Sequence, residues 1–476
     1  MNEPYLNSLS VSPDFIDLRP RIDDKTILRN PHKGWYMHYI DNGLTRRIYR
    51  DGIPAGDHLE NFPGMHHLYL RMDWADLEKE EGKMDFTELD AIFSEWAPFG
   101  YRFAFRLCCF VRGGNPYSTP KWVREAGAKG TELPLQSGPG FDAPKGEIAW
   151  EPDYGDPIFL EKLESFLKRF GEKYNGHPLV EFVDIGTFGT WGEGHTSGGT
   201  EKRYSADVLR RHVDLHLKYL PDTQLLLNDD MVNTAFLGGE STFGRDGTES
   251  ALRFAAYCAG KGIGLRDDSV CVKYYSQMFG YDTLRTGYLF DLFSPTAPVD
   301  LEFEHYNRVS PEGFKDGYAF LEALKRTHAS FAGFHGYPQE WLKTRSAFTE
   351  YAANRLGYWY FFTGLDLPEC VSGMKTLARL NVENRGWAPA YHPFELKVQA
   401  VCGEKRYLLF KAEGKNLRWQ TQCTEILPLS FVGVPAGKYE LEIGLFEKDQ
   451  PIQLAIQAQY QDQGYYRLCT FSVKEG

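Results

Sequence analysis

A carboxyl group and an imidazole stand two residues apart in the segment "GTWGEGHTS", where Glu193 and His195 alternate with glycines. Both residue types hold and transfer protons, and a carboxyl group can act as a general acid or base. Gly192 and Gly194 leave the backbone free to adopt conformations closed to other residues, so a ligand can approach closely. The alternative is a turn that merely contains a charge. The choice depends on where other strands of the chain end.

The elements that must position these residues follow a strand-then-helix rhythm from about residue 34 to residue 362. The predicted strands are 34–40, 67–72, 102–110, 180–188, 223–229, 262–267, 299–305 and 329–335. Leu89, Ile92, Phe93 and Trp96 form one helical stripe, and Phe159, Leu163, Phe166, Phe170 and Tyr174 form another. Eight such units predict an α/β fold, a (β/α)₈ TIM barrel. A doubly wound open sheet is the alternative, but no GxGxxG turn follows the first strand.

Polar residues gather near the ends of these strands. They are Asp73, Arg106, Glu193, His195, Asn228, Asp229, Asp230, Asp267, Asp268, Glu302, Glu304, His305 and His335. Barrel enzymes form their active sites at the C-terminal ends of the strands, so the pattern is typical of a functional barrel. Helix N-caps also favour Asp and Asn directly after strands, and we interpret Asp230 and Asp268 as capping residues. Glu and His are poor N-caps, which favours a site role for Glu193, Glu304 and His335.

The rest of the chain predicts a cleft and a second domain. Segments 111–154 and 271–298 are too long for plain connectors, and long loops on the active face usually shape a binding cleft. After Gly364, short alternating strands with a "PAGKY" turn predict an all-β, immunoglobulin-like sandwich. We therefore expect a catalytic barrel over residues 1–364 and a smaller β-sandwich domain over residues 365–476.

The overall composition excludes several classes of partner. The net charge is −12 and no basic tract is present, which argues against nucleic acid and anionic membranes. Eight scattered cysteines without zinc-ligand spacing indicate reduced, mostly buried thiols. The N-terminus lacks a signal-peptide pattern and no apolar run reaches membrane length, so we expect a cytoplasmic chain. No cofactor is expected, and a homo-oligomer is left open.

One stretch carries a family resemblance. In "LRMDWADLEKEEGKMDFTELDAIFSEWAPFGYRFAFRL", Trp74, Glu78, Gly82, Asp85 and Phe86 match the pattern W-x-x-x-E-x-x-x-G-x-x-D-F. The stretch resembles the second and third barrel units of retaining glycoside hydrolases, in the clan that includes β-galactosidases and many β-glucanases. The "GTWGEGHTS" run with the C-terminal sandwich is similar to a poorly characterised glycosidase-like family of bacterial barrel proteins, which brings no assigned substrate.

The resemblance implies two catalytic carboxyl groups. The clan places its general acid/base Glu after strand four and its nucleophile Glu at the end of strand seven, positions that fall on Glu193 and Glu304. Glu302 competes for the second role. Glu302 and Glu304 share one side of their strand, and the later residue lies nearer the rim, which favours Glu304. One departure from the clan is Gly192, which stands where an Asn usually precedes the acid/base Glu.

Retaining hydrolysis requires the two carboxyl groups about 5–5.5 Å apart, one protonated and one ionised. Trp191 would raise the pKa of Glu193, and Arg71 or Arg106 would hold Glu304 ionised. Trp35, Trp74 and Trp191 are stacking platforms for a sugar or, alternatively, core residues. The expected carbohydrate contacts are Trp35, Arg71, Asp73, Trp74, Arg106, Trp191, His195, Asn228, Asp229, Asp267, Glu302, His305 and His335.

Two rival functions remain open from the sequence. The first is a metal-dependent barrel hydrolase that uses Glu193, His195, Asp229, Asp267 and His335. No His-x-His follows the first strand, so we expect no metal. The second is a catalytically silent carbohydrate-binding barrel, which the Gly192 departure keeps open.

Overall fold

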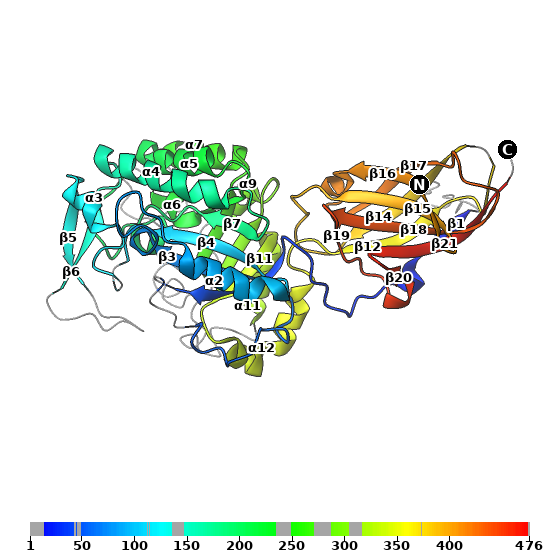
Figure 1. The fold of residues 1–476 in the computed structure, drawn as a ribbon, viewed down its shortest axis with the longest axis horizontal. Coiled ribbons are helices and arrows are strands. Elements are labelled where there is room, and N and C mark those ends of the chain that lie inside the picture. The colour runs from blue at the N-terminus through cyan, green and yellow to red at the C-terminus, as the bar shows by residue number, and fades with distance from the viewer. Residues whose placement is uncertain are drawn as a thin grey trace, which may run out of the picture. The chain divides into compact units, whose positions relative to one another are not determined.

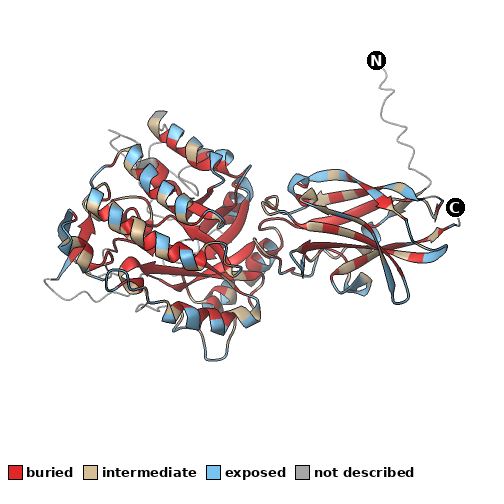
Figure 2. Ribbon diagram, turned by 45° about the horizontal axis from the view of Figure 1, so that its top comes forward, coloured by how far each residue is buried: buried red, intermediate tan, exposed pale blue. Residues whose placement is uncertain are grey.

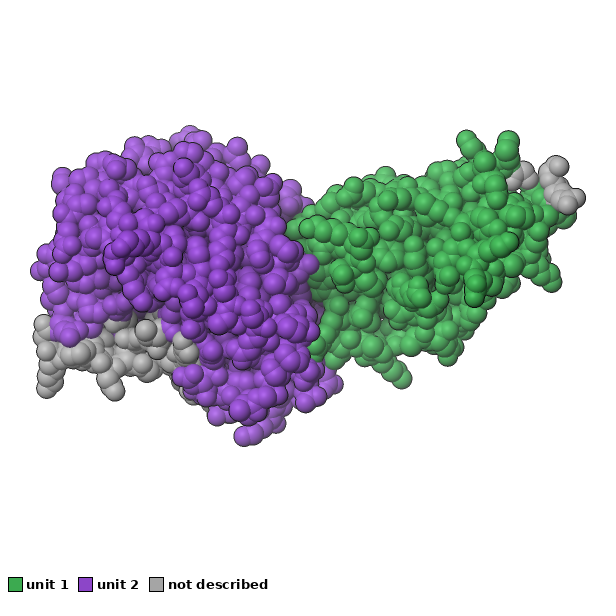
Figure 3. Space-filling view, in the orientation of Figure 1, with its two compact units in different colours: residues 1–32, 357–476 green, residues 33–356 purple. Residues whose placement is uncertain are grey.

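The computed structural model of the 476-residue chain describes residues 14–41, 44, 49–111, 113, 115–135, 147–234, 249–270, 287–303, 317–372 and 374–474. The chain divides into two compact units (Figure 3). One unit comprises residues 33–356, and the other comprises residues 1–32 together with residues 357–476. The unit of residues 33–356, purple in Figure 3, contains the barrel, and the other unit, green in Figure 3, is rich in β-strands.

Eight strands close into a parallel barrel, which confirms the predicted fold class (Figure 1). Around the barrel they are β2 (Gly34–Ile40), β3 (Met65–Asp73), β4 (Arg102–Cys108), β7 (Val180–Asp184), β8 (Leu225–Asn228), β9 (Gly264–Val270), β10 (Val299–Phe303) and β11 (Ala329–Phe334), which pairs with β2. Each corresponds to one of the eight predicted strands. An antiparallel hairpin, β5 (Gly130–Pro134) with β6 (Ile148–Pro152), follows β4 in the segment expected to shape the cleft.

Helices lie between the strands along the chain, with one buried and one exposed side (Figure 2). Those described are α1 (Trp74–Leu77), α2 (Thr87–Trp96), α3 (Lys121–Glu125), α4 (Pro157–Tyr174), α5 (Ala206–Tyr219), α6 (Asp229–Thr234), α7 (Glu249–Gly260), α9 (Gly287–Phe293), α11 (Tyr318–Arg326) and α12 (Pro338–Ala353). Asp156 caps α4, because its Oδ1 accepts the N–H groups of Ile158 and Phe159. The stripes predicted for α2 and α4 are the buried sides of these helices. Within the described ranges, no helix is long and apolar enough to cross a membrane.

The barrel interior is layered, because inward-facing residues of a strand are two apart. One layer is a buried cluster of Tyr36, Tyr69, Ala104, Phe182, Leu226 and Phe331. The next layer toward the C-terminal strand ends is charged and fully buried, and consists of Arg106, Asp184, Arg266 and Asp300. Asp184 Oδ2 accepts the Tyr69 hydroxyl at 2.7 Å and Arg106 Nε at 2.8 Å. The charges of this layer are paired, as buried charges must be.

Replacing Gly333 with alanine is expected to destabilise the barrel by about 2–3 kcal/mol, a typical cost of overpacking. A Cβ at Gly333 would lie 2.0 Å from the Tyr36 ring. The ring cannot move freely, because its hydroxyl accepts a hydrogen bond from Arg266 at 2.8 Å. Denaturant unfolding measures the change. Gly260→Ala is the matched control, since nothing lies within 4 Å of its Cβ position. Equal stability of the Gly333 variant and the wild type would contradict this packing.

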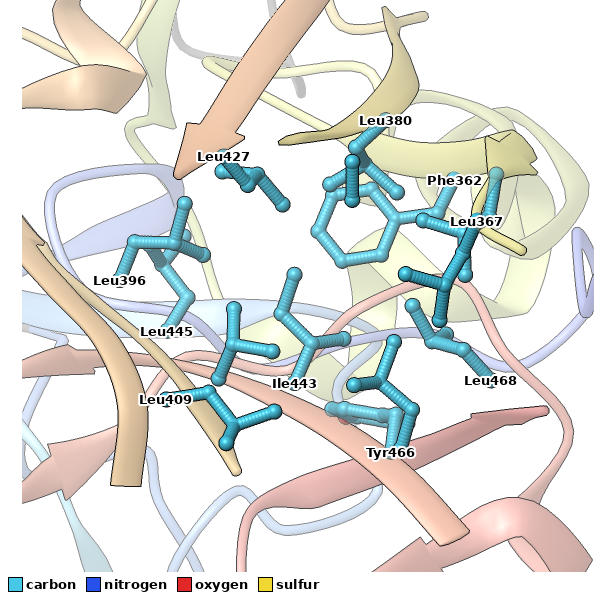
Figure 4. Packing of buried hydrophobic residues seen from close by; sticks show 14 of the residues in the cluster. Phe362, Leu367, Leu380, Leu396, Leu409, Leu427, Ile443, Leu445, Tyr466 and Leu468 are labelled. Carbon is cyan, nitrogen blue, oxygen red and sulfur yellow. The ribbon is translucent and has the colours of Figure 1, made fainter. Parts of the chain in front are cut away.

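The β-rich unit consists of two sheets around one hydrophobic core (Figure 4). The first sheet contains β1 (Phe15–Asp17), β12 (Tyr360–Asp366), β14 (Lys375–Asn384) and β17 (Gln422–Ser430). The second contains β13 (Cys370–Val371), β21 (Tyr465–Val473), β18 (Gly437–Glu447), β15 (Glu395–Cys402) and β16 (Lys405–Glu413), with β19 (Gln450–Pro451) and β20 (Gln461–Asp462) beside it. β1, from the start of the chain, pairs antiparallel with β12. The β-rich C-terminal region is therefore as predicted.

Candidate active site

Charged side chains converge above the charged layer, at the C-terminal ends of the barrel strands. They come from inward positions of the strands or from the segments that follow the strands. His38, Arg71, Asp268 and Glu302 lie on β2, β3, β9 and β10, Asp41 and His335 follow β2 and β11, and Glu193 follows the short 3₁₀ helix η3 (Thr190–Gly192) after β7. Hydrogen bonds and ion pairs connect these side chains into one group, which we call the strand-end network.

Glu193 occupies one side of this network. Its Oε1 accepts a hydrogen bond from Arg71 NH1 at 3.0 Å, and Arg106 NH1 lies 3.7 Å from the same oxygen. His195 Nε2 lies 3.2 Å from Glu193 Oε2. The Glu193 side chain keeps 18% of its surface exposed, whereas Arg106 is fully buried. The carboxyl group is thus held firmly while one face stays accessible.

Burial raises the pKa of Glu193 above its ordinary value, and the negative charge of Asp268 raises it further. His195 and Arg71 act in the opposite direction. Asp268 lies near Glu193 because both carboxyl groups contact Arg106. Arg106 NH1 lies beside Glu193 Oε1 and donates to Asp268 Oδ2 at 3.2 Å. A carboxyl group of this kind keeps its proton to higher pH than a free glutamate, as a general acid must.

Replacing Asp268 with asparagine is expected to move the basic limb of the pH–rate profile to lower pH. The change removes a negative charge next to Glu193 and keeps an oxygen that can accept from Arg106. Glu193 then loses its proton at lower pH, and an enzyme that needs protonated Glu193 loses activity there. The measurement is kcat/KM against pH. A basic limb that stays in place would show that Asp268 does not control Glu193.

Glu302 occupies the other side of the network and is almost completely buried. His38 Nε2 lies 2.8 Å from Glu302 Oε2, and His335 Nε2 contacts Oε1. Arg266 forms an ion pair with the same carboxylate. Burial lowers the pKa of His335 to about 3 and that of His38 well below its ordinary value, so both rings are neutral at neutral pH. The rings stack with centroids 3.8 Å apart. Arg266 therefore supplies the positive charge opposite Glu302.

Asp41 joins the two sides. It accepts a hydrogen bond from Arg71 Nε at 2.7 Å and lies 3.6 Å from His335 Nδ1. Burial alone would raise the pKa of Asp41, but the Arg71 guanidinium and the two neighbouring histidines hold it well below its ordinary value. Glu193, Arg71, Asp41, His335 and Glu302 thus form a continuous chain of contacts across the mouth of the barrel.

The strand-end network and the charged layer beneath it together contain, among the described residues, more carboxyl groups than guanidinium groups. The carboxyl groups are Asp41, Asp184, Glu193, Asp268, Asp300 and Glu302, and the guanidinium groups are Arg71, Arg106 and Arg266. Surplus buried negative charge favours protonation of some members. Burial raises the pKa of Asp300 to about 6, in line with this. The site can therefore hold one carboxyl group ionised and another protonated near neutral pH.

The loop before Glu193 explains the departure from the clan pattern. Gly192 has φ of 72°, and a Cβ there would lie 2.7 Å from the carbonyl oxygen of Gly186. An asparagine does not fit here, because its Cβ would clash with this carbonyl oxygen, although its backbone could adopt the left-handed conformation. The backbone of Trp191 is also in the left-handed region, with φ of 55°. Its carbonyl oxygen accepts a hydrogen bond from the Cys108 thiol at 3.2 Å. Such strain in a non-glycine residue is common at functional sites.

Trp191 is the half-buried member of the three predicted aromatic platforms, and its ring lies 6.0 Å from that of His195. The structure does not bring Trp35 and Trp74 to the site. Trp35 packs among Phe62, Phe320, Trp341 and Phe348, and Trp74 stacks on Phe166 of α4. Both are fully buried. Trp35 faces the helical layer because its neighbour on β2, Tyr36, faces the barrel interior, and Trp74 is the first residue of α1. Their alternative interpretation, core packing, is the one observed.

The W-x-x-x-E-x-x-x-G motif, on which the family resemblance rests, makes structural contacts within the barrel unit. Glu78 is fully buried and accepts hydrogen bonds from Trp74 Nε1 at 2.8 Å and from the Gly82 N–H at 2.7 Å. Arg169 of α4 forms an ion pair with it. The spacing W-x-x-x-E-x-x-x-G therefore produces a buried turn fastened to a neighbouring helix, and it lies outside the strand-end network.

The remaining described candidates have varied placements. Asn228 Oδ1 accepts the Asp230 N–H at 3.0 Å, and its buried Nδ2 has no hydrogen-bond partner among the described residues. Asp73 precedes α1 as its N-cap residue. Asp267 alternates with Arg266 and Asp268 on β9, so it faces the opposite side of the strand from the network. Asp229 begins α6 and is fully buried. Glu304 and His305 lie outside the described residues.

Sequence reasoning missed His38, Asp41, Asp184, Arg266 and Asp300. It also interpreted Asp268 as a helix cap, whereas Asp268 lies within β9 and contacts Arg106. Alternation was the available signal: Asp300 and Glu302 are two apart within the predicted strand 299–305, and Arg266 and Asp268 are two apart where β9 runs past the predicted end at residue 267. Polar residues repeating at this spacing in a parallel strand face the barrel interior together.

Comparisons with known proteins find similar structures but no family. No family model matches the chain, and no curated protein matches it. Solved structures similar to it include the catalytic domain of β-amylase from Paenibacillus polymyxa, with 11% identity, a TM-score of 0.46 and coverage of 70% of this chain and 100% of that one. Endo-glycoceramidase II from Rhodococcus sp., solved as a lactosyl-enzyme intermediate, has 13% identity, a TM-score of 0.43 and coverage of 86% and 99%. β-Galactosidase from Marinomonas ef1 has 10% identity, a TM-score of 0.39 and coverage of 63% and 53%.

Proposed function

We propose that the chain is a glycoside hydrolase that acts on a carbohydrate through two carboxyl groups at the C-terminal ends of its barrel strands. The observation that carries the proposal is the strand-end network, in which Glu193 and Glu302 stand on opposite sides with different partners. Glycosidic bond cleavage needs this division, because one group donates a proton and the other carries negative charge.

Glu193 is the proposed general acid/base. Burial and Asp268 raise its pKa, its side chain stays partly exposed, and His195 contacts its second oxygen. Trp191 is the proposed platform for the sugar ring, since aromatic faces pack well against sugars and its side chain is only half-buried. The substrate is therefore expected to lie between Trp191 and the network.

The ionised carboxylate is proposed at the end of β10. The sequence favours Glu304 there, and that prediction stands untested because Glu304 lies outside the described residues. The contacts of Glu302 favour Glu302 instead, since Arg266 compensates its charge and two neutral histidines fix its orientation. We propose Glu302 as the nucleophile of a retaining reaction, with Glu304 as the competing residue.

A panel of aryl α- and β-glycosides tests the proposal directly. Release of the aryl group by the wild type, with loss of that release in Glu193→Gln for the panel members that have poor leaving groups, is the expected result. Proton NMR of the first sugar product then gives the stereochemistry, and retention of the anomeric configuration is expected. Binding of sugars without turnover of any panel member would favour the carbohydrate-binding alternative.

A metal-dependent hydrolase is the second candidate, because His38, Glu302 and His335 place their ligand atoms within 4.8 Å of one another. Two imidazoles and a carboxylate form a common zinc-ligand set, and Asp41 lies beside the other ring nitrogen of both histidines. The Arg266 guanidinium at Glu302 opposes a cation there. Of the residues that the sequence suggested for a metal, only His335 belongs to this set.

Elemental analysis separates the two candidates. A glycosidase using Glu302 as nucleophile is expected to purify without stoichiometric zinc, manganese or nickel and to keep its activity in EDTA. One equivalent of metal that is lost from His38→Ala, together with activity restored by adding that metal, would favour the metal-dependent hydrolase.

A further inference from the structure

A buried carboxyl group outside the strand-end network lies against the loop that carries Glu193 and His195. Glu151 belongs to β6 of the inserted hairpin and is 1% exposed. Its Oε2 accepts the backbone N–H of Thr200 at 2.5 Å. Gly199 passes so close that a Cβ there would lie 2.5 Å from the same oxygen. The hairpin and the loop over residues 193–202 are therefore in direct contact through this carboxyl group.

The loop depends on such contacts because few of its residues are apolar. Its backbone makes tight turns, with left-handed φ values at Gly194, Gly198 and Glu201. A second contact with the hairpin region is exposed: Lys202 Nζ donates to Asp153 Oδ2 at 2.7 Å. The buried contact through Glu151 is the stronger anchor, since a hydrogen bond in a dry site is weakened little by solvent.

Several titratable groups face Glu151 from the elements packed around it. They are Tyr154, which follows β6, His195 on the loop, and Asp153, Lys202 and Tyr204 at the same junction. Burial raises the pKa of Glu151 to about 7, while the Thr200 N–H, Tyr154 and the charge on His195 act in the opposite direction. Near neutral pH, Glu151 is therefore partly ionised, and its charge acts on His195.

We propose that Glu151 is a positioning residue for the hydrolysis proposed above: it holds the Thr200 N–H and so fixes the loop that presents Glu193 and His195. This inference rests on the proposed role of Glu193. Glu151 touches neither the network carboxylates nor the proposed sugar platform in the described contacts. Its effect on the reaction passes through the loop and through His195, which contacts Glu193 Oε2.

Kinetics of matched variants test the proposal. Glu151→Ala is expected to lower kcat about 10²-fold, the typical cost of a misplaced catalytic group, with little change in KM. Glu151→Gln is expected to keep most of the activity, because its amide oxygen still accepts the Thr200 N–H. Asp153→Asn, which alters the exposed contact at the same junction, should leave kcat unchanged. In a Glu193→Gln background, Glu151→Ala should cause no further loss. The same loss in both backgrounds would overturn the proposal.

Hydrogen exchange tests the contact without relying on activity. The Thr200 amide is expected to exchange faster in Glu151→Ala than in the wild type and in Asp153→Asn, while the barrel-strand amides stay protected and show that the variant is folded. An unchanged Thr200 rate in Glu151→Ala would overturn the inference whatever the activity. A wild type that hydrolyses no glycoside, with a faster Thr200 rate in the variant, would refute the proposed function and leave the loop contact standing.

Thermal melting adds a test of the buried charge. The pKa of Glu151 is higher in the folded protein than in the unfolded chain, so the protonated form is favoured by folding. The contribution of Glu151 to the free energy of unfolding is therefore fully present at low pH and is lost as pH rises through about 7. Glu151→Gln should melt at a higher temperature than the wild type at pH 8 and at a similar temperature at pH 5. A lower melting temperature at pH 8 would contradict a buried carboxyl group at this contact.

Discussion

Replacing Glu302 with alanine is expected to lower glycoside hydrolysis by at least about 10⁴-fold, a loss comparable to that of a nucleophile in other hydrolases. Without the carboxylate, no covalent glycosyl intermediate forms. The measurement is kcat/KM on the best aryl glycoside of the panel. Sodium azide should restore turnover by attacking the sugar in place of Glu302, and the product should be a glycosyl azide of inverted configuration.

The same experiment on Glu304 decides between the two glutamates. Glu304→Ala is the matched control, since it removes the same group two residues later in the sequence. Loss and azide rescue in the Glu304 variant, with activity retained in the Glu302 variant, would contradict the assignment to Glu302 and support the prediction from sequence. Loss without azide rescue in both variants would exclude a nucleophilic role for either residue.

Replacing Glu193 with glutamine is expected to cost about 10²–10⁴-fold for substrates with poor leaving groups and far less for activated aryl glycosides. The poorer the leaving group, the more it needs a proton from Glu193. A plot of log kcat/KM against leaving-group pKa should therefore be steeper for the variant than for the wild type.

The pH dependence of the same variant gives a second criterion. Wild-type activity should fall at high pH as Glu193 loses its proton, at a pH above the ordinary glutamate value because burial and Asp268 raise its pKa. Glutamine has no proton to lose, so the basic limb should disappear in Glu193→Gln. An equal loss for all leaving groups, with the basic limb retained, would show that Glu193 is not the general acid.

Much of the fold could be predicted because each element carries its own local signal. The α4 stripe from Phe159 to Tyr174 repeats at helical spacing, and Asp156 with Pro157 marks its start. The pairing of β1 with β12 could not be predicted, because a strand of three residues shows no periodicity. In addition, β1 precedes the barrel in the sequence and β12 follows it. Short strands are defined by tertiary pairing rather than by pattern.

The candidate site was predicted in part. Arg71, Arg106 and Glu302 were expected at the site and lie there, whereas His38, Asp41 and Arg266 were missed. His335 stands directly after an apolar run and Glu193 in the loop that follows one, so their position at the mouth follows from the barrel rule. Arg266 was missed because a buried arginine contradicts the usual rule for strand interiors, and its partners Asp300 and Glu302 come from the neighbouring strand. Such charges are stable only as a group, and a single sequence does not reveal the group.

The pairing of β1 with β12 has a consequence for biosynthesis. A ribosome completes β1 first and β12 only after the whole barrel, at roughly 5–20 residues per second, so β1 waits for its partner on the order of tens of seconds. The barrel, as a contiguous segment between the two, can fold during this interval. A recombinant fragment that starts after the barrel would lack β1 and expose the edge of β12 to self-association. Expression of the β-rich unit alone therefore calls for a circularly permuted chain in which residues 14–32 follow residue 474.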